Sequence, residues 1–140
     1  MKAIEPDLKQ RILDRISQIP IFSTLEMDVG QVGEGYFEVT IPRRVKWDGI
    51  FQSLHGGILM TLADSTAAFA ILTQTGPDEP MTTTDMNIRF LAPCLSPATA
   101  KAKVIKLGRT MCPVSVDIFD AQGALVAVAQ VNYMRLGERK

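Results

Sequence analysis

The sequence predicts an α+β fold in which one antiparallel sheet of about five strands curls around a single long, buried helix. Residues 55–72 are apolar on nearly every side and contain one charged residue, Asp64. A helix with that pattern belongs inside a protein. The residues that follow change to the alternating pattern of half-buried strands and keep it almost to the end of the chain. With 140 residues, the chain has the length of a single domain, 1–140.

An N-terminal helix is expected within residues 1–20. Proline is tolerated at the first helical position, here Pro6, and apolar residues recur at helical spacing until Pro20 ends the pattern. From Met27 to Ile41 the apolar residues alternate instead, and the glycines of Gly33–Gly35 interrupt them. This is typical of a β-hairpin with one buried face.

The central helix is expected to span residues 55–75, because Gly76 and Pro77 follow its last turn. A helix that is covered on one side only shows a polar stripe, and this one scarcely does. Either the sheet wraps far around the helix or a second subunit covers the rest.

Further strands are expected at 82–90, 98–104, 114–118 and 124–133. In the first of them, strict alternation places Thr82, Thr84, Met86, Ile88 and Phe90 on one face and Thr83, Asp85, Asn87 and Arg89 on the other. The last is rich in valine and alternates less, as an interior strand does.

Composition argues against binding of nucleic acid or of an anionic membrane, because 15 Lys+Arg balance 15 Asp+Glu. The two cysteines, Cys94 and Cys112, and the one histidine lack metal-ligand spacing, so we expect reduced thiols and no metal. Residues 1–20 are too charged for a signal peptide. The apolar run is interrupted by Asp64 and is expected to fall short of the ~18 residues of a membrane span. A cytoplasmic protein is expected.

A buried carboxylate must be paired, neutralised or used, and Asp64 stands within a set of short motifs. These are His55-Gly56-Gly57, Leu62-Ala63-Asp64, Thr84-Asp85-Met86-Asn87-Ile88 and Lys106-Leu107-Gly108-Arg109-Thr110. The ordered set, from about residue 20 to the end, resembles the hotdog-fold acyl-CoA thioesterases of the phenylacetate-pathway (PaaI-like) type.

The resemblance implies a hotdog fold, with a five- to six-stranded antiparallel sheet wrapped around the long helix. It implies homodimers, often stacked as homotetramers, and hydrolysis of acyl-CoA thioesters without a metal or organic cofactor. Carried onto this chain, the Gly56 N–H would polarise the thioester carbonyl, and Asp64 would act as general base on water or as nucleophile. Thr83 lies where some members use a hydroxyl to position the water.

The physical chemistry of a helix start agrees with the role given to Gly56. Unpaired N–H groups and the positive end of the helix dipole meet there, and glycine lets a substrate oxygen approach the backbone. However, Gly56 and Asp64 are eight residues apart, which is ~12 Å along a helix. We therefore infer that each site pairs Gly56 of one subunit with Asp64 of a neighbour.

One position departs from the family. Members often have an Asn or Gln six residues before the histidine, where its amide holds the thioester carbonyl, but this chain has Gly49 there. Gln52 and Asp48 are the nearest polar candidates to replace it.

The remaining candidates have both a structural and a binding interpretation. His55 is expected to cap the helix start and to shape the loop, with direct substrate contact as the alternative, and Gly57 belongs to the same motif. Lys106, Arg109 and Arg89 could meet the phosphates of CoA or form an ordinary solvated surface.

Two other functions stay open at this point. A hotdog-fold hydratase or dehydratase acting on enoyl or hydroxyacyl thioesters would need His55 as a catalytic group. A non-catalytic acyl-CoA-binding module would be consistent with the missing amide at Gly49 but not with the retained Asp64.

Overall fold

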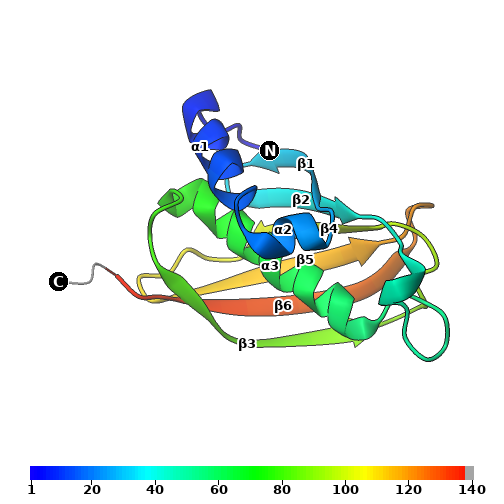
Figure 1. Ribbon diagram of the computed structural model, residues 1–140. Helices are drawn as coiled ribbons and strands as arrows, with labels where there is room; N and C mark the ends of the chain where they lie inside the picture. Colours follow the sequence, from blue (N-terminus) through cyan, green and yellow to red (C-terminus); the bar gives the residue numbers. More distant parts are fainter. Residues whose placement is uncertain (138–140) are drawn as a thin grey trace.

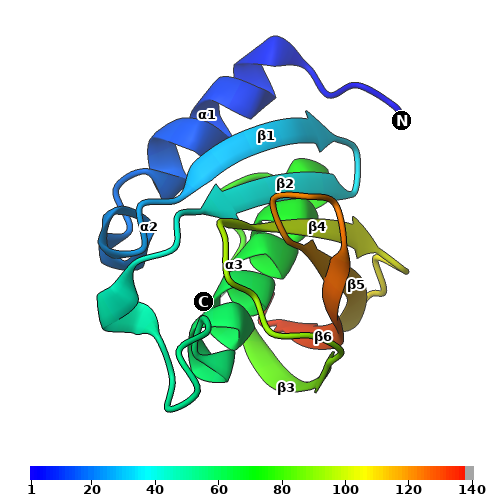
Figure 2. The same cartoon turned by 90° about the vertical axis from the view of Figure 1, so that its right-hand side faces the viewer.

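A computed structural model describes residues 1–137 and shows the predicted α+β architecture. In this part of the chain, six strands form one antiparallel sheet in the order β1-β2-β4-β5-β6-β3. They are β1 (Asp28–Gly33), β2 (Tyr36–Ile41), β3 (Met81–Phe90), β4 (Ala98–Val104), β5 (Met111–Phe119) and β6 (Leu125–Arg135). Seen end-on in Figure 2, the sheet curves around the long helix α3 (Gly56–Thr75), which confirms the expected hotdog fold.

Helix α3 begins where the sequence predicted. His55 is its N-cap residue and Gly76 its C-cap residue, and Gly76 adopts a φ of 86°, a left-handed conformation that favours glycine. Helix α3 is 20 residues long with a mean hydropathy of 1.4, enough by length and composition for a membrane span, so the expectation that the run is too short was wrong. The core helix of a globular fold has the same properties, and 56% of the apolar window is buried here.

The N-terminal region forms two helices rather than one. Helix α1 (Pro6–Ile16) buries Ile12 and Ile16 and packs against α3, beside the β1 edge of the sheet (Figure 1). Pro20 ends the first pattern as predicted, but it also occupies the first turn of a short helix, α2 (Pro20–Thr24), where its missing N–H costs nothing.

The inner face of the sheet lets α3 approach closely. On β4 the inward residues are three fully buried alanines, Ala98, Ala100 and Ala102, next to the larger side chains of β2 and β5. Cys94 and Cys112 are both buried free thiols, as expected. Burial raises the pKa of the Cys112 thiol, so this sulfur stays protonated.

Candidate active site

Asp64 lies on a stripe of α3 that the rest of the described chain leaves partly uncovered. The partly or fully exposed residues of the stripe recur at helical spacing: Gly57, Met60, Thr61, Asp64, Ser65 and Ala68. The sheet therefore wraps most of the helix but not this face. Of the two arrangements expected from the sequence, the far-wrapping sheet accounts for most of the helix, and cover by a second subunit stays a prediction for this stripe. The carboxylate is half-buried in the middle of the stripe.

Thr83 reaches Asp64 because strand β3 contains a bulge. The pairing of β3 with β6 shifts register between Thr83 and Asp85, which turns Thr83 to the same side as Met86 and Ile88. Its hydroxyl donates to Asp64 Oδ1 at 2.7 Å. The prediction that Thr83 shares a face with Asp85 was therefore wrong, since strict alternation does not allow for the extra residue of a bulge.

A third residue completes this cluster, and the sequence analysis missed it. Tyr133 of β6 lies opposite Thr83 in the sheet and is 7% exposed. Its hydroxyl donates to Asp64 Oδ1 at 2.8 Å and lies 2.9 Å from the Asp64 carbonyl oxygen. Burial, and then the neighbouring Asp64 carboxylate, raise the pKa of the Tyr133 hydroxyl, while a hydrogen bond with Thr83 opposes the shift.

The two hydroxyl groups leave the carboxylate asymmetric. Asp64 Oδ1 accepts both hydrogen bonds, whereas Asp64 Oδ2 accepts none from residues 1–137. A carboxylate held in this way presents one free oxygen in a fixed direction. That oxygen can take a proton from water or attack an electrophilic carbon.

The start of α3 offers a free backbone donor. His55 Nδ1 accepts a hydrogen bond from the Gly57 N–H at 2.9 Å, so His55 caps the helix as expected. The Gly56 N–H donates to no acceptor in the described chain. The ring of Phe90, at the end of β3, lies against Gly56, where an added Cβ would be 3.1 Å from the ring carbon Cζ. Glycine thus keeps this N–H accessible beside an aromatic wall.

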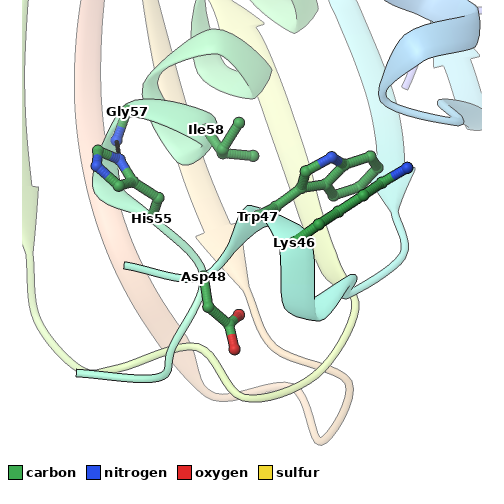
Figure 3. Close-up of a pocket in the computed structure, with 6 residues that line it drawn as sticks. All are labelled: Lys46, Trp47, Asp48, His55, Gly57 and Ile58. Carbon is green, nitrogen blue, oxygen red and sulfur yellow. Dashed lines mark hydrogen bonds between the residues drawn. The ribbon is translucent and has the colours of Figure 1, made fainter. Parts of the chain in front are cut away.

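Two hollows flank the start of α3 in the described part of the molecule. One, of about 400 Å³, lies between His55 and the short helix η1 (Val45–Trp47) and is drawn in Figure 3. The other, of about 420 Å³, lies between Gly56, Leu59 and the segment from Phe90 to Cys94. Both are large enough to take part of an organic ligand.

The loop before α3 is fixed by Arg43. Its guanidinium group donates to Asp48 Oδ2 at 2.6 Å and to the Gln52 carbonyl oxygen at 2.9 Å. The Asp48 carboxylate is thereby engaged, and in Figure 3 it points away from His55. Gln52 is exposed, with a left-handed φ of 63°, and its side chain has no hydrogen-bond partner among residues 1–137. Asp48 is thus engaged elsewhere, whereas the replacement by Gln52 of the amide that is absent at Gly49 stays a prediction.

The three basic candidates lie away from Gly56 within one chain. Lys106 and Arg109 are exposed in the turn between β4 and β5. The backbone N–H of Arg135 donates to the Thr110 carbonyl oxygen, which holds that turn at the end of the sheet where β3 begins. Arg89 is on the outer face of the sheet, turned away from Asp64. None of the three meets Asp64 or Gly56 in a single copy.

Comparison with known proteins gives a consistent assignment. Residues 51–127 match the sequence profile of the thioesterase superfamily. A Saccharolobus solfataricus protein that carries the provisional name of an esterase is 34% identical over 110 residues, 78% of each chain. Human acyl-coenzyme A thioesterase 13 is 37% identical over 79 residues, 54% of this chain and 55% of that one. The structure of the Escherichia coli PaaI protein from the phenylacetic acid degradation operon superposes with a TM-score of 0.87 at 24% identity, over 96% of this chain and 97% of that one.

Proposed function

Because the chain belongs to the thioesterase superfamily, we propose that it hydrolyses acyl-CoA thioesters to the free acid and CoA. The observation that carries the proposal is the Asp64 carboxylate, held at Oδ1 by Thr83 and Tyr133 and free at Oδ2. Similarity to acyl-coenzyme A thioesterase 13 supports CoA as the thiol. We propose that the reaction needs no metal or organic cofactor.

The proposed reaction uses the two groups that have no partner within the described chain, Asp64 Oδ2 and the Gly56 N–H. A water molecule attacks the thioester carbonyl carbon and gives its proton to Asp64 Oδ2, while the Gly56 N–H stabilises the negative charge that develops on the carbonyl oxygen. Collapse of this intermediate breaks the carbon–sulfur bond, and the CoA thiolate leaves and takes a proton. Direct attack by Asp64 uses the same geometry. In a single turnover in heavy-oxygen water, general-base catalysis places the label in the product acid. Hydrolysis of a covalent anhydride at the Asp64 carbonyl carbon places it on Asp64 instead, because the product then leaves with an Asp64 oxygen.

We propose that each site is shared between two copies of the chain. Gly56 lies against Phe90 at the end of β3, whereas Asp64 is bonded to Thr83 near its beginning. Along α3, Gly56 and Asp64 are eight positions, about 12 Å, apart, which is too far for both to act on one carbonyl group. In the described chain, β3 is an edge strand with one side unpaired, so a second copy can pair with it antiparallel about a two-fold axis.

Antiparallel pairing reverses the ends of β3 and brings Gly56 of one copy towards Asp64 of the other. It also brings the turn with Lys106 and Arg109 of the second copy to the Gly56 end of the first, because that turn lies where β3 begins. These cations would then be available to the phosphates of CoA, which supports the homodimer as the smallest active unit. Homotetramers would stack two such dimers.

Thiol release from a panel of acyl-CoAs tests the proposal. Wild-type protein is expected to release free CoA. Asp64→Asn keeps the shape of the side chain and its hydrogen bonds to hydroxyl groups, but it cannot accept the proton, so kcat is expected to fall by at least ~10²-fold. Wild-type turnover in purified, folded Asp64→Asn protein would refute the mechanism, and binding of acyl-CoA without thiol release would show a non-catalytic module.

A further inference from the structure

Tyr133 is hydrogen-bonded to Asp64 from strand β6 of the sheet. It projects from β6 and pairs across the sheet with Thr83 of β3 and with Cys112 of β5. Thr83 donates to the same carboxylate oxygen, and the Cys112 sulfur is directed to the Gly108 carbonyl at 3.8 Å. Tyr133 is thus the one titratable side chain of the described residues that is hydrogen-bonded to Asp64.

We propose that Tyr133 is a positioning residue, whose hydroxyl holds Asp64 Oδ1 so that Oδ2 alone faces the thioester. The proposal rests on the function proposed above. One hydrogen bond, from Thr83, would leave the carboxylate free to rotate about that contact. A second donor on the same oxygen, 2.8 Å away and from a different strand, fixes the plane of the carboxylate.

The surroundings of Tyr133 suit this task. Its aromatic ring is buried in the core, and its hydroxyl has Asp64 Oδ1 and the Asp64 carbonyl within reach for a single proton. The charged carboxylate is the stronger acceptor of the two. Because burial raises the pKa of this hydroxyl, Tyr133 remains a donor throughout the pH range in which a carboxylate base works.

The contact with the Asp64 carbonyl also ties β6 to the middle of α3, so loss of the hydroxyl has a structural cost as well. A matched control is available in Tyr36, the other of the two tyrosines in the sequence. Its hydroxyl also donates to a carboxylate, that of Glu38, but on the outer face of the sheet. Tyr36→Phe therefore removes the same chemical group far from the proposed site.

The experiment compares Tyr133→Phe, Tyr36→Phe and wild type with one acyl-CoA substrate. In Tyr133→Phe we expect kcat to fall about tenfold or more, the size of a lost hydrogen bond to a charged group, with KM little changed. A carboxylate that accepts one hydrogen bond fewer holds its proton more tightly. The acidic limb of the kcat profile is therefore expected to move to higher pH in Tyr133→Phe and to stay in place in Tyr36→Phe.

The possible failures are distinguishable. If wild type releases thiol and Asp64→Asn does not, but Tyr133→Phe keeps both its kcat and its acidic limb, the positioning role is wrong and the function stands. If Asp64→Asn keeps its turnover, the proposed mechanism itself is wrong. Should Tyr133→Phe not fold, 3-fluorotyrosine incorporated into the Tyr36→Phe protein makes the Tyr133 hydroxyl a stronger donor. The acidic limb must then move to lower pH, and an unmoved limb would overturn the proposal.

Discussion

Replacing Gly56 by proline removes the proposed oxyanion donor while leaving the helix intact. Gly56 is the first residue of α3, where proline is well tolerated because its missing N–H has no intrahelical partner. The residue before a proline must be extended, and His55 already is, with φ −57° and ψ 134°. No hydrogen bond among the described residues is lost.

The matched control is Gly56→Ala, which keeps the N–H. Both substitutions add a Cβ 3.1 Å from Cζ of Phe90, and Phe90 is 49% exposed, so its ring can move aside in either variant. The melting temperatures of the two variants are therefore expected to be similar. Any large difference in turnover between them reports the N–H group alone.

The expected loss is large. Removal of one oxyanion donor typically costs ~3 to 4 kcal/mol of transition-state stabilisation, which lowers kcat by ~10²- to 10³-fold. We expect this loss in Gly56→Pro and a smaller loss in Gly56→Ala, which adds a Cβ but keeps the N–H, with both measured as thiol release. A Gly56→Pro protein that turned over like Gly56→Ala would refute the role of this N–H.

The same variant tests whether the site is shared between copies. A mixed dimer of Gly56→Pro and Asp64→Asn subunits would hold one doubly altered site and one intact site. After subunit exchange in equal amounts, half of the dimers are mixed, so about a quarter of the wild-type activity should return. If exchange is complete and no activity returns, each site is built within one copy.

Two further predictions concern the loops. His55→Ala is expected to lower stability by about 1 kcal/mol, because the cap on the Gly57 N–H is lost. His55→Asn is expected to restore this stability, and both variants are expected to retain thiol release. Loss of all activity in a stable His55→Asn protein would favour the hydratase. Gly108→Ala would place its Cβ 2.3 Å from the Met111 carbonyl oxygen and should cost about 1–3 kcal/mol in chemical denaturation. Gly49→Ala, whose Cβ would stand 3.6 Å from His55, is its neutral control, and equal stabilities for the two would contradict the clash.

The strands and the central helix could be predicted because each buries one continuous set of side chains with a fixed period. Apolar residues alternate strictly on β4 and β5, as in half-buried strands, and the apolar run of α3 ends at Gly76. These patterns fit few other secondary structures. The short helix α2 was missed because Pro20 was interpreted only as the end of the N-terminal helix. Proline also suits the first turn of a new helix, and a five-residue helix is too short to show a period.

The bulge in β3 could not be predicted from the same pattern. A single extra residue exchanges the two faces of a strand from that point on, and the threonines at 82–84 fit either face equally well. The inward face of Thr83 becomes clear only from its pairing with Tyr133 on β6. Tyr133 was missed because its contact with Asp64 spans 69 residues of sequence. A buried tyrosine needs a partner for its hydroxyl, which is the signal that could have drawn attention to it.

The uncovered stripe of α3 explains why the helix lacks an ordinary polar face. Its members, from Gly57 to Ala68, include no lysine, arginine or glutamate, which a face meant for water would carry. They also include Thr61, Asp64 and Ser65, which a fully buried face would avoid unless each were paired. Small and weakly polar residues with one oriented carboxylate suit a surface that a substrate and a second copy cover together. Cover by a substrate and a second copy would then explain both the composition of the helix and the asymmetric hydrogen bonding of Asp64.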